Sequence, residues 1–120
     1  MHQLVTYNAL VGYEIESFRK EKSIEQKDLA NKTGISQPVL SRLEKGKASI
    51  TIDQLFVISE ALGTYPQEII RKAYDGVLAI RGEDSIDVDT SKKAGSNNAG
   101  ALLTGAAIGA VLTLLLARGK

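Results

Sequence analysis

The segment from Gln26 to Gly46 holds the residues with the clearest chemical potential. It predicts two short helices joined by a turn at Gly34, and the second helix has a polar, exposed edge. A helix of this kind can enter the major groove of DNA while the preceding helix braces it. Lys45 and Lys47 flank Gly46 and place positive charge directly after the second helix. These residue types suit the binding of a nucleic acid through hydrogen bonds and charge.

The residue inventory argues against catalysis. The 120 residues contain no Cys and one His, so neither a disulfide, a thiolate zinc site nor a His-centred catalytic group is expected. No nucleophile–base pair, carboxylate constellation or phosphate-binding glycine loop appears in the sequence. We therefore expect a protein that is not an enzyme, with no catalytic residues, no metal and no cofactor. The net charge of +1 by itself does not predict nucleic-acid binding.

Five short helices are needed to position these residues. Apolar residues at helical spacing predict them over about 11–22, 25–32, 37–45, 52–62 and 66–73. Ser36 is a good N-cap for the third helix, and Pro38 is tolerated in its first turn. The pattern offers no run of strands, so an all-α fold is predicted. The expected core of the second and third helices consists of Leu29, Ala30, Val39, Leu40 and Leu43.

Several motifs occur in order between Val11 and Ile70. They are Phe18-Arg19-Lys20-Glu21-Lys22, Gln26, Asp28-Leu29-Ala30, Thr33-Gly34-Ile35-Ser36, Leu40-Ser41-Arg42-Leu43-Glu44-Lys45-Gly46 and Ala61-Leu62-Gly63. With these spacings the segment, about half of the chain, resembles the lambdoid-repressor-like, or Xre-type, helix-turn-helix family. The resemblance implies a compact five-helix DNA-binding domain, which we place over residues 8–74.

The resemblance also implies contacts with double-stranded DNA. Gln26 lies where the family contacts a phosphate, and the backbone amides near Ser36 suit a phosphate oxygen. The outer edge of the third helix, here called the reading edge, consists of Gln37, Pro38, Ser41 and Arg42. Gln37 can bind an adenine edge, and Arg42 a guanine or a phosphate. Lys45 and Lys47 can bind the DNA backbone.

Arg19 and Glu44 resemble the family's internal ion pair between the first helix and the end of the third, so a structural role is expected for both. Two positions depart from the family pattern. Pro38 replaces a residue that often reads bases, which limits this position to apolar contact. Glu25 places an anion where a neutral polar residue is common near phosphate. Modest sequence specificity is the expected consequence.

The rest of the chain divides into a linker and an apolar segment. Residues 75–98 are expected to form a linker, which is flexible from Glu83 to Asn98, where Asp, Ser, Lys, Gly and Asn dominate. Within this range, Val77 to Ile80 could instead extend the fifth helix or pack as a short separate element. Residues 99–117 are uncharged, and as a helix they would span roughly 28 Å, close to the hydrocarbon thickness of a bilayer. A single transmembrane helix is therefore predicted, and the alternative is burial in an oligomer or against the globular domain. Small residues recur every fourth position as a helix-packing face: Ala101, Gly105, Gly109 and Thr113.

Two functions from different classes are compatible with this sequence. The first is a sequence-specific DNA-binding transcriptional regulator, in particular a repressor, acting as a homodimer or higher homo-oligomer. Its DNA-binding domain would lie in the cytoplasm, anchored to the inner membrane by the C-terminal helix. The alternative is a structural or interaction module that uses the same fold for protein binding, with a glycine-rich assembling tail. Glu25 and the near-neutral charge favour the alternative, whereas Gln26, Gln37 and Arg42 favour DNA.

Overall fold

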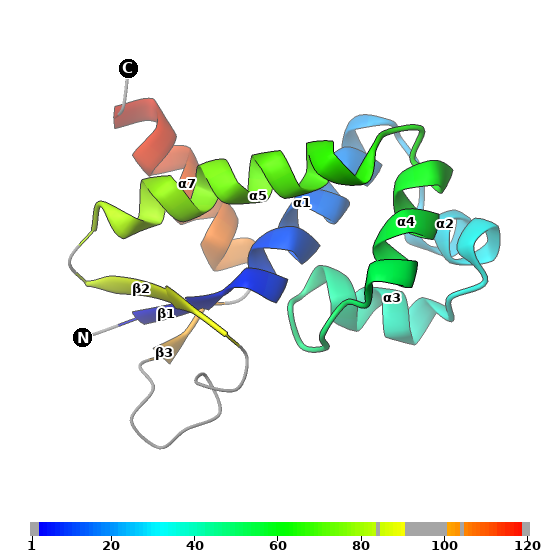
Figure 1. The fold of residues 1–120 in the computed structure, drawn as a ribbon, viewed down its shortest axis with the longest axis horizontal. Coiled ribbons are helices and arrows are strands. Elements are labelled where there is room, and N and C mark those ends of the chain that lie inside the picture. Colours follow the sequence, from blue (N-terminus) through cyan, green and yellow to red (C-terminus); the bar gives the residue numbers. More distant parts are fainter. Residues whose placement is uncertain (1–2, 84, 91–100, 104, 119–120) are drawn as a thin grey trace.

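The computed structural model describes residues 3–83, 85–90, 101–103 and 105–118. Its elements in chain order are β1 (Gln3–Thr6), α1 (Tyr7–Glu21), α2 (Gln26–Thr33), α3 (Gln37–Glu44), α4 (Ile52–Ala61), α5 (Pro66–Arg81), β2 (Ile86–Asp89), β3 (Ala101–Leu102) and α7 (Gly105–Arg118). Figure 1 shows α2, α3 and α4 gathered at one end of the molecule and the strands at the other, with α1 and α5 running between them. The five expected helices are thus present in order, and α5 continues to Arg81, which is one of the two possibilities that the sequence left open for residues 77–80.

Local sequence explains how the helices around the turn begin and end. Gly34 ends α2 in the left-handed conformation, with a φ of 75° that a residue without a Cβ adopts at low cost. The Ser36 hydroxyl caps α3 by accepting a hydrogen bond from the backbone N–H of Val39 at 3.4 Å. Thr51 and Gln54 form a reciprocal capping box at the start of α4. These caps fix the direction in which α3 leaves the turn.

The inner faces of the first five helices form most of the core, and the strands and α7 add to it. Fully buried side chains come from each of the five helices, and examples are Ile15, Leu29, Leu40, Ile58 and Ile69. α1 contacts both α3 and α5, and α2 contacts α3 and α4. The helix that carries the reading edge is therefore held by α1 on one side and α2 on the other.

The prediction of an all-α fold is wrong, because three short strands form a parallel sheet in the order β2–β1–β3. The register of β1 with β2 runs from Gln3↔Ile86 to Thr6↔Asp89, and β3 pairs with the other edge of β1. The side chains of Leu4, Val5 and Ile86 are buried, so the sheet closes one end of the core. Strands of two to four residues are too short for an alternating pattern to reveal them.

The segment predicted as a linker contains regular structure. Within residues 75–98, the last turns of α5 and all of β2 are ordered elements that carry the buried side chains of Val77, Ile80 and Ile86. Residues 91–98 lie outside the described residues. The domain boundaries at 74 and 98 stay a prediction.

The prediction of a transmembrane helix over residues 99–117 is also wrong. Over the described ranges, none of the helices combines the length and the apolar character that a bilayer crossing requires. The apolar run starts with β3, so α7 has only 14 residues. It contacts α1 and α5, and its Ile108 and Leu112 are buried in the same core. The alternative of burial against the globular domain therefore describes this segment.

The small residues of α7 lie beside residues of their own chain. A Cβ on Gly109 would lie 3.1 Å from Cε1 of Tyr13 in α1, so glycine permits this close approach. A Cβ on Gly105 would lie 3.9 Å from the backbone oxygen of Glu44. Thr113 is exposed, and Ala101 lies in β3 instead of a helix. The packing of two copies through this face stays a prediction.

Candidate nucleic-acid interface

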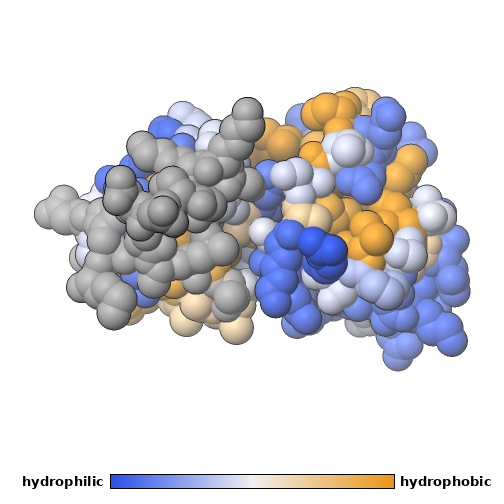
Figure 2. Space-filling model, turned by 90° about the horizontal axis from the view of Figure 1, so that it is seen from below, coloured by the Kyte–Doolittle hydropathy of each residue, from blue (hydrophilic) through white to orange (hydrophobic). Residues whose placement is uncertain are grey.

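The two helices and their turn present the reading edge to solvent. Leu40 and Leu43 of α3 are buried, whereas Gln37, Pro38 and Arg42 are exposed. Ser41 is half-buried. Figure 2 views the molecule from the side of α3, and apolar side chains there are bordered by hydrophilic ones. No part of the described chain covers this edge, because its side chains keep their exposure in the folded molecule.

Val39 adds an apolar group to this surface. The prediction that it lies in the core is wrong. Its exposed fraction is 41%, whereas its neighbour Leu40 is fully buried. Consecutive residues on a helix point about 100° apart, so both cannot face the same core. The spacing of Leu40 and Leu43 by three residues was the signal that could have placed Val39 outside. Its methyl groups can contact a thymine methyl in a major groove.

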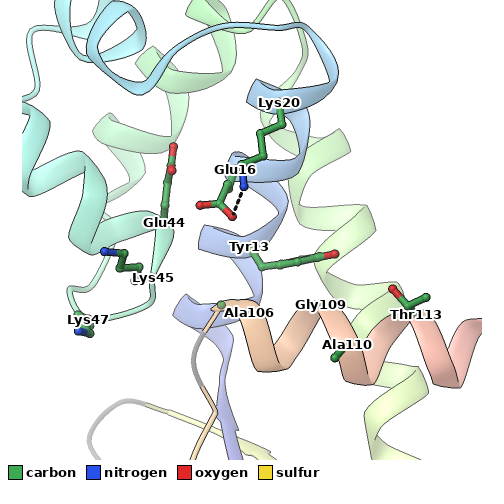
Figure 3. A pocket seen from close by; sticks show the side chains of 11 residues that line it. Tyr13, Glu16, Lys20, Glu44, Lys45, Lys47, Ala106, Gly109, Ala110 and Thr113 are labelled. Atoms are coloured by element: carbon green, nitrogen blue, oxygen red, sulfur yellow. Dashed lines mark hydrogen bonds and ion pairs between the residues drawn. The ribbon is translucent and has the colours of Figure 1, made fainter.

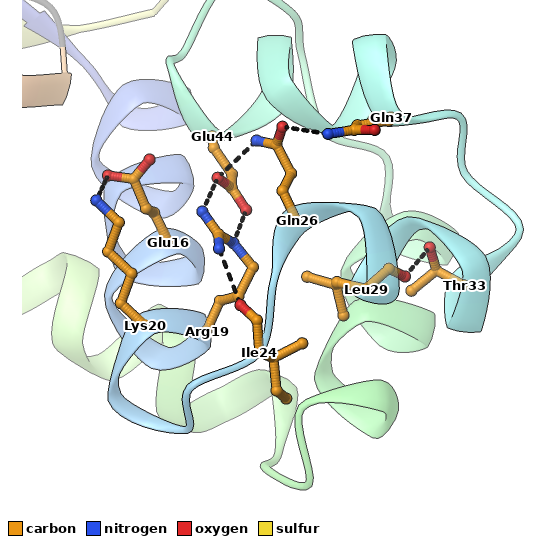
Figure 4. Close-up of polar contacts among 9 residues, drawn as sticks. All are labelled: Glu16, Arg19, Lys20, Ile24, Gln26, Leu29, Thr33, Gln37 and Glu44. Atoms are coloured by element: carbon orange, nitrogen blue, oxygen red, sulfur yellow. Dashed lines mark hydrogen bonds and ion pairs between the residues drawn. The ribbon is translucent and has the colours of Figure 1, made fainter.

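Four side chains connect the core to the reading edge by consecutive hydrogen bonds, here called the Glu44 network: Arg19, Glu44, Gln26 and Gln37 (Figure 4). Arg19 donates from Nε to Oε2 of Glu44 at 2.8 Å and from Nη2 to Oε1 at 3.0 Å. Gln26 Nε2 donates to the same Oε1 at 3.0 Å. Gln37 Nε2 then donates to Oε1 of Gln26 at 3.4 Å. α1, α2 and α3 are thereby joined through one carboxylate.

The ion pair at the base of the network is shielded from water. The side chain of Glu44 is 0% exposed and that of Arg19 is 10% exposed. The hydrogen bond from Arg19 to Glu44 raises the pKa of Arg19, although burial acts in the opposite direction. A third nitrogen of Arg19, Nη1, donates to the backbone oxygen of Ile24 at 2.9 Å. This pair fixes the orientation of α3 relative to α1 and the start of α2.

The amides of Gln26 and Gln37 form the part of the network that reaches the surface. Gln26 uses Nε2 as a donor to Glu44 and Oε1 as an acceptor from Gln37, so its side chain is held in one orientation. Gln37 uses one amide hydrogen in this contact. Its second amide hydrogen and its Oε1 make no hydrogen bond within the described part of the chain. Together these two groups are the donor and the acceptor that an adenine edge requires.

The loop after α3 holds the predicted cations in place. Arg42 Nη2 donates to the backbone oxygen of Lys47 at 3.3 Å, and the backbone N–H of Lys47 donates to the Arg42 oxygen at 2.8 Å. Gly46 has a φ of 74°, and a Cβ there would lie 2.6 Å from the Cα of Ala9. The loop is thus packed on α1, while the side chains of Lys45 and Lys47 remain exposed.

At the start of α2 lies Glu25, whose negative charge is expected from the sequence to weaken the binding of a phosphate. Glu25 is exposed at the N-cap position, and its carboxylate makes no capping hydrogen bond. Ser36 uses its hydroxyl for the cap of α3, so its contribution to binding a phosphate would come from the backbone amides at that helix start. The structure therefore brings Gln26 near Gln37 and Arg42 near the Lys45–Lys47 loop on one surface.

This arrangement of a braced helix with an exposed polar edge defines a helix-turn-helix protein, and the comparisons with known proteins agree. A helix-turn-helix family model matches residues 15–69. The uncharacterized HTH-type transcriptional regulator y4dJ of Sinorhizobium fredii is 34% identical over 61 residues, which cover 51% of this chain and 79% of that protein. The chain belongs to the Xre-type, lambda-repressor-like helix-turn-helix family of transcriptional regulators.

Two solved structures show the same fold. The clp gene regulator ClgR from Corynebacterium glutamicum has a TM-score of 0.59 at 26% identity, over 63% of this chain and 80% of that one. A variant of the restriction-modification controller protein C.Esp1396I has a TM-score of 0.57 at 25% identity, over 60% of this chain and 94% of that one. The family model ends at residue 69, so the end of α5, the strands β2 and β3, and α7 lie beyond the matched segment.

Proposed function

We propose that this chain is a sequence-specific DNA-binding transcriptional regulator that acts as a repressor. In this proposal α3 enters the major groove and α2 braces it across the phosphate backbone. The observation that carries the proposal is the exposed reading edge, whose first residue, Gln37, is oriented by the buried Glu44 through Gln26. Preorganised polar side chains lose little conformational freedom on binding, which favours recognition of one base sequence.

Each predicted contact residue has a role in this proposal. Gln37 binds an adenine edge, Val39 contacts a thymine methyl, and Arg42 binds guanine or a phosphate. Gln26 and the backbone amides at the start of α3 contact phosphates, as do Lys45 and Lys47. Because several of these contacts neutralise phosphates, affinity should fall steeply as salt concentration rises.

A homodimer supports the same function. Ile70, Tyr74 and Leu78 are spaced by four residues on α5 and are 46%, 53% and 52% exposed, so they form an apolar stripe that a second copy can cover. Two copies would place two α3 helices on half-sites about 34 Å apart, one turn of DNA. A dimer that occupies promoter DNA blocks RNA polymerase by its presence, and this requires no further contact with the polymerase.

The experiment that tests the proposal is selection of bound duplexes from a random library, followed by gel-shift titration at fixed salt. A defined consensus should emerge, and Gln37→Ala and Arg42→Ala should each weaken its binding about 5- to 150-fold, because a good base contact contributes about 1–3 kcal/mol. Arg81→Ala is the matched control, since it removes the same charge from the far end of α5. Failure to enrich any sequence, with equal affinity for all duplexes, would contradict the proposal of sequence-specific binding. Failure to bind any duplex would favour the protein-binding alternative.

A further inference from the structure

A groove lies between α1, the loop after α3 and α7, with a volume of about 610 Å³. Figure 3 shows Tyr13 and Lys20 on one wall, Lys45 and Lys47 on a second, and the small residues of α7 on the third. Its volume is within the range of small-molecule sites, about 300–1,000 Å³. Because α7 lies beyond the family match, this groove is an addition to the helix-turn-helix domain.

The charges at the groove favour an anion. Two carboxylates border it, but Glu16 is paired with Lys20 at 3.3 Å and Glu44 with Arg19 at 2.8 Å. Lys45 and Lys47 are exposed, and their ammonium groups form no ion pair among the residues that the structure describes. The surplus charge at this wall is therefore positive.

The α7 wall of the groove is mostly apolar, and hydroxyl groups come from Thr113 on this wall and from Tyr13 on the α1 wall. α7 contributes Ala106, Gly109 and Ala110, whose lack of larger side chains keeps the groove open. The hydroxyls of Tyr13 and Thr113 also line the groove. The Tyr13 hydroxyl is a hydrogen-bond donor at neutral pH, as that of tyrosine normally is, and burial, with added effects of nearby carboxylates, raises its pKa further. An apolar body beside a positive rim matches a molecule that has both an apolar part and a negative group.

We propose that this groove binds a small amphipathic organic anion, whose negative group lies at Lys45 and Lys47 and whose apolar part packs on α7. The inference rests on the proposed function in one respect, because the proposed function assigns the same two lysines to contacts with the DNA backbone. A bound anion occupies and neutralises these two lysines, so it competes with DNA for them. The groove would thus be an effector site through which a metabolite-sized anion releases the regulator from its operator.

Binding can be measured with the fluorescent anion 8-anilinonaphthalene-1-sulfonate and the full chain. Ala110→Phe fills the groove from an exposed position, and Ala117→Phe makes the same change on α7 at a residue that does not line it. The expected result is binding at least tenfold weaker for Ala110→Phe and unchanged for Ala117→Phe. Equal binding by both variants would place the probe elsewhere and overturn the inference.

The need for charge is tested with N-phenyl-1-naphthylamine, which lacks the sulfonate. It should bind the groove at least tenfold more weakly than the anion, and equal affinity would refute the assignment to an anion. In the DNA arm, saturating anion should weaken binding of a selected duplex at least fivefold for the wild type and for Ala117→Phe, but not for Ala110→Phe. An unchanged DNA affinity would overturn the competition. If no duplex is bound at all, the proposed function fails, while the probe measurements still decide on the groove.

Discussion

Replacing Glu44 with Gln tests how strongly one buried carboxylate holds the reading helix. The carboxylate accepts two hydrogen bonds from Arg19 and one from Gln26, and its side chain is 0% exposed, so water cannot replace it. A Gln side chain keeps one acceptor oxygen but turns an NH₂ group toward donors. Loss of one partner of a buried pair costs about 3–5 kcal/mol, and the retained oxygen places the expected loss near the lower limit, about 3 kcal/mol.

The assay is unfolding by urea at pH 7, monitored by circular dichroism. A domain of this size is stable by about 6–18 kcal/mol, so Glu44→Gln should remain folded but unfold at a clearly lower urea concentration. Glu16→Gln is the matched control, because its ion pair with Lys20 is exposed and contributes about 0.5 kcal/mol or less. If Glu44→Gln lost no more stability than this control, the network would not hold α3, and the reasoning would be refuted.

Three further changes probe other parts of the fold. Ile108→Ala should lower the free energy of unfolding by about 2–4 kcal/mol, whereas Leu114→Ala, at a side chain 60% exposed, should change it by about 0.5 kcal/mol or less; equal losses in urea would contradict the packing of α7. Gly12→Ala should cost about 1–3 kcal/mol, because its Cβ would lie 2.1 Å from the backbone oxygen of Leu43, and an unchanged melting temperature would disprove this close approach. Burial raises the pKa of Glu14, so the wild type loses stability as pH rises through that raised pKa. The free energy of unfolding of Glu14→Gln, measured in urea, should therefore rise relative to that of the wild type as the pH rises above about 4, the ordinary pKa of Glu, and a pH-independent difference would rule this out.

The helix-turn-helix part of the fold was predictable because its signals are local. Gly34, Ser36 and Gly46 mark helix ends within a few residues, and the apolar spacing of α3 shows which face is buried. The sheet could not be predicted in the same way. β1 and β2 have four residues each, and the five helices of the domain separate them in the sequence.

The place of α7 depends on a surface that the sequence does not display. An apolar segment of this composition suits a bilayer and a protein core equally well, so length was the main guide. What decides is the complementary surface on α1 and α5, against which Ile108 and Leu112 of α7 are buried, with Leu112 next to Gly76 of α5. Such a contact joins residues far apart in the chain, and no local pattern encodes it.

The sequence predicted the residue types of the candidate site and one of its connections, the ion pair of Arg19 with Glu44. The motif named Gln26, Gln37 and Glu44 separately, whereas their consecutive hydrogen bonds follow from the packing of three helices. Val39 was misplaced because its residue type suggested burial, while the helical phase set by Leu40 places it outside. Residue type therefore predicts candidates, and tertiary geometry decides which of them act together.

The most direct test of DNA recognition by α3 is a titration of the isotope-labelled protein with a selected duplex. The titration is monitored through the chemical shifts of the backbone amides in NMR spectra. The largest shifts should occur at Gln37, Ser41 and Arg42, with smaller ones at Gln26 and Lys47. Saturable shifts confined to α5 and α7, with α3 unchanged, would contradict the account.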